Sequence, residues 1–168
     1  MKIKLVRKFF SWKWRYCVTD ERKNSLYFIS IKMGKIGREI FVYCKDKVRD
    51  DEYIACIREM FSVFFSPLRY TVEIDGQVVC EMVQKPTLTN SSLAFEGMRL
   101  YLYENDVLIR DKFVLRDDDN VIMNMSKFYR CYGLDVINSE KALFCICVAL
   151  VVDCATARSW GTRSTSSL

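Results

Sequence analysis

Apolar and polar residues alternate with a period of two in several segments between residues 12 and 126. One such segment places Tyr70, Val72 and Ile74 on one face and Thr71 and Glu73 on the other. The same alternation occurs over residues 12–18, 27–33, 98–103 and 121–126. Because successive side chains of a strand point to opposite faces, each segment predicts a β-strand with one buried and one solvated face, as in antiparallel sheets.

Polar turn sequences separate these segments. Asp75-Gly76 lies between two alternating segments and is the strongest hairpin signal in the chain. Polar breaks of turn size also occur at residues 20–25, 104–106 and 117–120. Ten or more short antiparallel strands in this arrangement predict a mainly β protein, either a sandwich or a closed barrel.

One segment departs from the period of two. Every residue from Ala142 to Val152 is apolar, and Asn138-Ser139-Glu140 supplies capping residues before it. These features favour a helix over about residues 138–152, although the β-branched residues leave a central strand as the alternative. The run is shorter than the roughly 20 apolar residues that a membrane span needs. A helix that is apolar all round must be buried all round, and a barrel lumen would provide that environment.

The domain organisation follows from these elements. Residues 1–154 are predicted to form a single barrel domain, and residues 155–168, which are rich in Ser and Thr, a flexible tail. The N-terminal residues are charged and contain no signal peptide, and no transmembrane segment is predicted. A cytoplasmic location is therefore expected, with a peripheral association at the membrane as a further option.

The amino-acid composition excludes several kinds of catalytic and metal-binding site. The chain contains no histidine, which excludes Ser-His-Asp and Cys-His catalysis and every histidine-containing metal site. Its 8 cysteines form no C-x-x-C pair, and most lie in apolar runs, so they are expected to be reduced core residues without a metal. No catalytic residue and no cofactor is predicted, and the protein is not expected to be an enzyme.

Charge is distributed unevenly along the chain. Residues 1–49 contain 14 basic and 4 acidic residues, which gives +10, whereas the rest of the chain carries −5. Alternation turns Lys13 and Arg15 to the side opposite Trp12 and Trp14. The predicted anion-binding or lipid-binding residues are Lys13, Arg15, Lys32, Lys35 and Arg38. The alternative is that these cations are simply the solvated faces of strands.

Three further groups of residues are candidate sites. Asp117-Asp118-Asp119 offers oxygen ligands for Ca²⁺ but lacks the EF-hand spacing, so a solvated hairpin tip is favoured. Cys145 and Cys147 are expected to pack in the core. Asp153 follows the apolar run and is expected to reach solvent or to bond a backbone N–H.

Some local sequences resemble a known family. They are Lys8-Phe9-Phe10-Ser11 before Tyr16 and Asp20, the hairpin Arg69–Gly76, and the closing segment Ala142–Cys154. They resemble the LURP-one-related family, including its small bacterial YxjI-like members. The resemblance implies the tubby C-terminal-like fold shared with phospholipid scramblases, a 12-stranded antiparallel barrel around a central C-terminal helix. The chain differs from the family pattern at Glu21-Arg22-Lys23-Asn24, where the usual glycine of the first turn is missing.

The predicted function combines the basic segment with this resemblance, because tubby proteins bind phosphoinositides and scramblase-like relatives act at membranes. The chain is expected to be a non-enzymatic binding module for an anionic membrane surface, with an anionic phospholipid or phosphoinositide as partner. The alternative is a structural or regulatory protein-interaction domain with a protein partner. Nucleic acid is disfavoured, because no exposed aromatic platform is expected beside the cations.

Overall fold

Among the residues that a computed structural model describes, twelve strands and one long helix make up the fold. The structure describes residues 1–8, 15–46, 52–60, 68–85, 92–97, 99–104, 112–128 and 131–161. The strands are β1 (Lys2–Arg7), β2 (Tyr16–Asp20), β3 (Ser25–Met33), β4 (Arg38–Cys44), β5 (Ala55–Met60), β6 (Leu68–Ile74), β7 (Gln77–Lys85), β8 (Ser92–Glu96), β9 (Leu100–Glu104), β10 (Lys112–Asp117), β11 (Asn120–Phe128) and β12 (Cys131–Val136). A 3₁₀ turn, η1 (Ser139–Lys141), leads into α1 (Ala142–Gly161).

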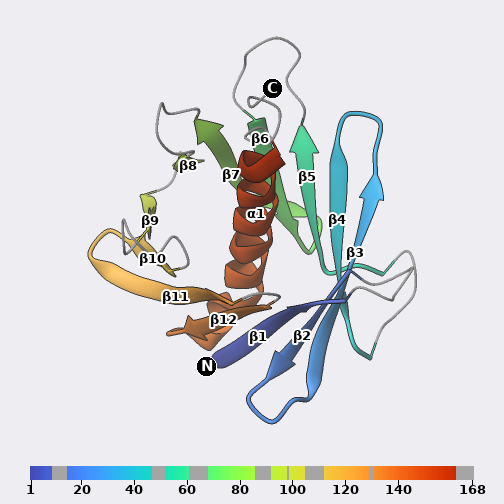
Figure 1. Ribbon diagram of the computed structural model, residues 1–168, viewed down its shortest axis with the longest axis vertical. Coiled ribbons are helices and arrows are strands. Elements are labelled where there is room, and N and C mark those ends of the chain that lie inside the picture. The colour runs from blue at the N-terminus through green and yellow to red at the C-terminus, as the bar shows by residue number, and fades with distance from the viewer. Residues whose placement is uncertain are drawn as a thin grey trace.

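The strands form one antiparallel sheet that curls into a nearly closed barrel around α1 (Figure 1). Its order is β8-β7-β6-β5-β4-β3-β2-β1-β12-β11-β10-β9, so β1 joins the two halves of the chain by pairing with both β2 and β12. In the described residues no ladder joins β8 to β9, which lie at the two ends of this order. The predicted mainly β barrel of about twelve strands around a C-terminal helix is confirmed, and its closure is nearly complete.

Helix α1 is the core of the barrel. Every residue from Cys145 to Val152 is at most 1% exposed. Apolar side chains from the inner faces of the strands, such as Leu5, Val18, Ile57 and Leu134, belong to the same buried cluster as the helix. Fully burying an aliphatic side chain contributes about 1.5–3 kcal/mol, so this helix–barrel contact is a large share of the fold's hydrophobic stabilisation.

The helix continues further than the sequence predicted. It ends at Gly161 instead of near residue 152, so residues 155–161 are helical and do not belong to a tail. The polar residues after Val152 do not stop it: the Thr156 hydroxyl donates 2.9 Å to the carbonyl of Val152, one turn back. Residues 162–168, the remainder of the predicted tail, lie outside the described part of the chain.

The hairpin turns follow their sequences. Asp75 and Gly76 both have positive φ, 50° and 76°, and connect β6 to β7 as the sequence predicted. A two-residue turn of this type matches the right-handed twist of the strands, and Asp-Gly tolerates the left-handed backbone that it requires. Asp118, in the turn between β10 and β11, also has a positive φ of 49°.

The two ends of the barrel differ in what they contain. At one end, β1 and β3 finish, β2 and β4 begin, and α1 reaches its C-terminal half. Figure 1 shows the C-terminal part of α1, in red, at the same end as the tip of β5. The other end holds Met1, the turn before Ser25, the turns at Asp75 and Asp118, and η1.

Candidate functional site

Cations from the N-terminal third gather at the end of the barrel where α1 reaches its C-terminal half. Arg7, Lys8, Arg15, Lys32 and Lys35 are all exposed there, and we call these five residues the basic rim. Three of them, Arg15, Lys32 and Lys35, were predicted as site residues. Lys13, also predicted, lies outside the described residues. Sequence-based reasoning therefore identified a group of cations that the fold brings to one end of the barrel.

Arg38, the fifth predicted residue, is held differently. Its register partner on β3 is Met33, and it alternates with Ile40 and Val42, so its side chain belongs to the inner face of β4. There the guanidinium donates two hydrogen bonds to Glu59, from Nε to Oε2 at 2.6 Å and from Nη2 to Oε1 at 3.0 Å. These hydrogen bonds raise the pKa of the Arg38 guanidinium further above its ordinary value. Arg38 thus neutralises a buried carboxylate inside the barrel end and is not part of the basic rim.

Two of the exposed lysines lie over aromatic rings on the outer wall. The Lys8 ammonium is 5.7 Å from the centroid of Phe28, and that of Lys32 is 5.3 Å from the centroid of Phe41. Tyr53 packs edge-on against Phe41, with 5.0 Å between the ring centroids. Such contacts hold an ammonium at a fixed place on the surface, each with about 0.5–1 kcal/mol. The sequence analysis missed these aromatic partners, although the outward positions of Phe28 and Lys32 follow from the period of two.

A buried polar cluster lies inside the barrel at the same end. The carboxylate of Asp153, on α1, accepts hydrogen bonds from the hydroxyls of Tyr16 on β2 and Tyr132 on β12. Burial, and then the charge of Asp153, raise the pKa of both phenols well above the ordinary value of 10.0. The expectation that Asp153 reaches solvent or bonds a backbone N–H is wrong, because the helix continues past it and carries its side chain into the barrel. The inward alternation of Tyr16 was a signal for this cluster.

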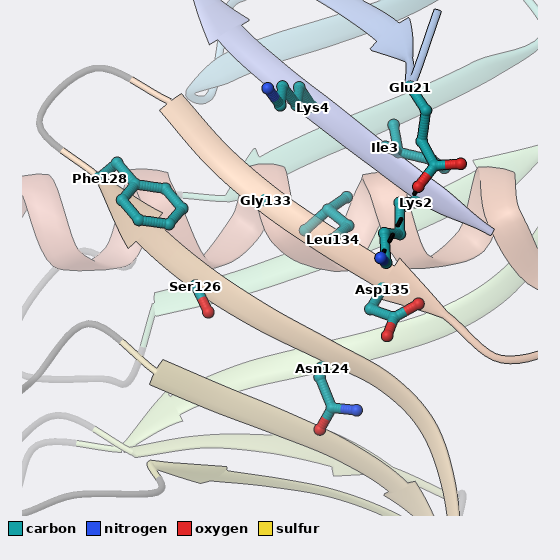
Figure 2. A pocket seen from close by; sticks show the side chains of 10 residues that line it. All are labelled: Lys2, Ile3, Lys4, Glu21, Asn124, Ser126, Phe128, Gly133, Leu134 and Asp135. Atoms are coloured by element: carbon teal, nitrogen blue, oxygen red, sulfur yellow. Dashed lines mark ion pairs between the residues drawn. The ribbon is translucent and has the colours of Figure 1, made fainter.

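A groove crosses the outer wall of the barrel over β1, β12 and β11 (Figure 2). Its volume is about 570 Å³. It is lined by Lys2, Ile3, Lys4, Glu21, Asn124, Ser126, Phe128, Gly133, Leu134 and Asp135. Figure 2 shows Phe128 at one end of the groove and Lys2 with Asp135 at the other. The sequence analysis did not anticipate this groove, because it depends on the pairing of β1 with β12.

The acidic turn between β10 and β11 is tied to neighbouring cations. Asp117 lies 3.4 Å from the ammonium of Lys141, and Asp118 lies 3.8 Å from the guanidinium of Arg99. In the part of the chain that the structure describes, no three Cys, Asp or Glu side chains cluster as a metal site would require. The turn is an exposed hairpin tip at the barrel end opposite the basic rim.

All eight cysteine thiols are free. Cys145 and Cys147 are fully buried on α1, which confirms their predicted place in the core. Burial raises the pKa of each of these two thiols to about 12. A thiol with such a pKa stays protonated at neutral pH, so neither cysteine is activated as a nucleophile.

Among the described residues, no helix combines the length and the apolar character that crossing a bilayer demands.

Comparison of sequences with known proteins finds a relative of this chain. No family model matches the chain, and no solved structure matches it. Over 89 residues the chain is 34% identical to the uncharacterized protein YxjI of Bacillus subtilis (strain 168). The match covers 51% of this chain and 54% of YxjI, so it spans about half of each protein. This similarity supports the YxjI-like part of the predicted resemblance, and does not extend to the tubby-like and scramblase relationship.

Proposed function

We propose that the protein is a non-enzymatic module that docks on anionic membrane surfaces through its basic rim. The observation that carries this proposal is the gathering of exposed Arg7, Lys8, Arg15, Lys32 and Lys35 at one end of the barrel. Each Lys or Arg held near an anionic leaflet contributes about 1 kcal/mol to binding. A cluster of this size is sufficient for reversible attachment.

The distribution of acids supports one preferred orientation on the membrane. At the opposite barrel end, acidic residues outnumber basic ones among those described. These acids are Asp20, Glu21, Asp46, Glu52, Asp75, Asp117, Asp118, Asp119, Asp135 and Glu140. An anionic surface attracts the basic rim and repels this opposite end.

Apolar side chains stand between the cations of the basic rim. Met33 is 74% exposed and Ile36 is 66% exposed, on either side of Lys35 in the turn between β3 and β4. Cations beside exposed apolar side chains are typical of interfacial binding, where the apolar groups enter the headgroup layer. The eight free thiols suit a reducing compartment, so we place this surface on the cytoplasmic side of a membrane.

The test compares two variants with the same net charge. Lys32→Glu/Lys35→Glu changes the basic rim, whereas Lys23→Glu/Lys45→Glu changes two exposed lysines at the opposite end of the barrel. Co-sedimentation with vesicles of phosphatidylcholine and phosphatidylserine is measured at low and high salt. We expect the rim variant to lose at least about tenfold in affinity and the control to bind nearly as wild type does.

Three results would overturn the proposal. The first is wild-type protein that ignores these vesicles at low salt, which would favour a protein-interaction domain. The second is equal weakening of both variants, which would mean that net charge and not the basic rim governs attachment. The third is a rim variant that binds as wild type does while its circular dichroism spectrum stays native.

A further inference from the structure

The outer wall in and beside the groove carries three rows of paired residues. Lys112, Val6 and Cys131 belong to these rows but flank the groove and do not line it. The register places Lys2, Asp135 and Asn124 side by side in the first row. Lys4, Gly133, Ser126 and Lys112 form the second row. Val6, Cys131 and Phe128 form the third. Alternate residues of a strand lie about 6.6 Å apart, so the rows are evenly spaced along the wall.

The second row has the chemistry of an anion cradle. Lys4 and Lys112 are exposed, and their backbones lie three strand spacings apart, about 14 Å. Between them the wall carries Ser126 and Gly133, a residue without a side chain that is bordered by the ring of Phe128. In the described part of the chain, Lys4, Lys112 and Ser126 have no side-chain hydrogen bond or ion pair. Their donors are therefore available to an incoming oxyanion.

The third row is apolar. Phe128 is 60% exposed, and its ring lies beside Gly133, where a Cβ atom would come within 3.4 Å of the ring. Val6 and Cys131 continue this surface on the neighbouring strands. The next outward position, just after β1 ends at Arg7, is Lys8 of the basic rim. The groove therefore changes from charged to apolar in the direction of the basic rim.

We infer that this groove binds a single amphiphile with a phosphate headgroup, with the phosphate on the second row and the apolar part over Phe128. Lysine ammoniums, a serine hydroxyl and the Asn124 amide supply more donors than a carboxylate accepts, and they suit the several oxygens of a phosphate. One part of the inference rests on the proposed function, namely that the apolar part of the ligand leaves the groove toward the membrane that the basic rim would contact. The headgroup site itself does not require a membrane.

The test uses monomeric ligand, without vesicles. ¹⁵N-labelled protein is titrated with dihexanoyl phosphatidylserine below its micelle concentration, and in separate arms with inorganic phosphate and with octanoate. We expect the phospholipid to shift amide signals of β1, β11 and β12 around the second and third rows. Inorganic phosphate and octanoate should each bind at least tenfold more weakly, because each supplies half of the recognised chemistry.

Two variants change the groove in different ways. Gly133→Leu fills it at a position whose backbone does not require glycine, and Lys4→Glu/Lys112→Glu reverses the charges of the cradle. Each should weaken binding of the phospholipid at least tenfold, with Lys45→Glu as a charge control far from the groove. If Gly133→Leu does not fold, the charge-reversal variant alone decides, because both of its positions are exposed.

The outcomes separate this inference from the proposed function. Lys32→Glu/Lys35→Glu should still bind the monomer, even if that variant no longer binds vesicles. Phospholipid shifts elsewhere on the barrel, or groove variants that bind as wild type does, would overturn the inference. Equal binding of inorganic phosphate would indicate a free-phosphate site, and equal binding of octanoate a carboxylate site. Either result would also overturn it.

Discussion

The Tyr132 hydroxyl donates a hydrogen bond of 2.6 Å to Oδ1 of Asp153 in the interior of the barrel. Tyr16 donates to the other oxygen of the same carboxylate. A single side chain of α1 is thereby tied to β12 and to β2. We expect Tyr132→Phe to lower the free energy of unfolding by about 1.5–3 kcal/mol, the usual value of a hydrogen bond to a charged group. Urea unfolding measures this loss.

Removing the carboxylate should be more damaging than removing one phenol. Asp153→Leu leaves two buried hydroxyl donors without their acceptor, and each unsatisfied group costs about 1–3 kcal/mol. Its loss of stability should therefore exceed that of Tyr132→Phe in the same denaturation experiment. A variant Asp153→Leu as stable as wild type would mean that the cluster contributes nothing to the fold.

The two phenols make stability depend on pH in the alkaline range. An unfolded tyrosine ionises near pH 10.0, whereas burial keeps Tyr16 and Tyr132 protonated in the folded barrel. Above about pH 10 the folded state holds more protons than the unfolded state, so the free energy of unfolding falls as pH rises. Well below pH 10 these two phenols are protonated in both states and do not change the free energy of unfolding. Phenolate absorbance should show two fewer tyrosines that titrate only on unfolding in Tyr16→Phe/Tyr132→Phe than in wild type. Tyr16→Phe/Tyr132→Phe should show a shallower decline of stability with pH.

The Arg38–Glu59 pair predicts an asymmetric response to mutation. The Glu59 side chain is only 1% exposed, so Arg38→Met removes the Arg38 cation from a buried carboxylate. Breaking such a pair costs about 3–5 kcal/mol, whereas replacing both partners by apolar residues is often nearly neutral. Arg38→Met/Glu59→Leu should therefore be more stable than Arg38→Met alone. A double variant that is less stable than the single one would contradict this account.

Thiol reactivity should divide the eight cysteines into two groups. Cys44 and Cys131 are partly exposed, and the other six are buried. Burial raises the pKa of Cys80 to about 12 and that of Cys56 to about 11. Very little of either thiol is therefore ionised to the reactive thiolate at pH 8. Iodoacetamide followed by peptide mass spectrometry should label Cys44 and Cys131 first. Labelling of Cys147 at the same rate would show that the helix leaves the barrel readily.

The sequence was a good guide wherever a local pattern decides the structure. The period of two placed Tyr70, Val72 and Ile74 on the inner face of β6, and Asp75-Gly76 marked the turn that follows. The unbroken apolar run from Ala142 to Val152 predicted a helix that is buried all round. Each of these features depends on neighbours in the chain, or on the simple need to remove apolar surface from water.

What the sequence missed depends on distant partners. Cys17 lies on the outward face of β2 and is nevertheless only 4% exposed, because alternation predicts the face of a strand and not what covers that face. Arg38 was predicted to bind an anion together with the other four cations, but Glu59, 21 positions later, binds its side chain on the inner face of β4. Asp153 looked like the end of a helix because its partners Tyr16 and Tyr132 lie on other elements.

The position of α1 in the chain has a consequence for how the barrel forms. The helix that fills the lumen follows all twelve strands, and β1 must also wait for β12, which pairs Lys2 with Asp135. Pairings of such long sequence separation slow folding, typically to milliseconds or seconds. Twenty helical residues take about 1–4 seconds to synthesise at roughly 5–20 residues per second. During that interval a nascent sheet would expose its inner apolar face, so biosynthesis of this barrel should depend strongly on chaperones that shield it.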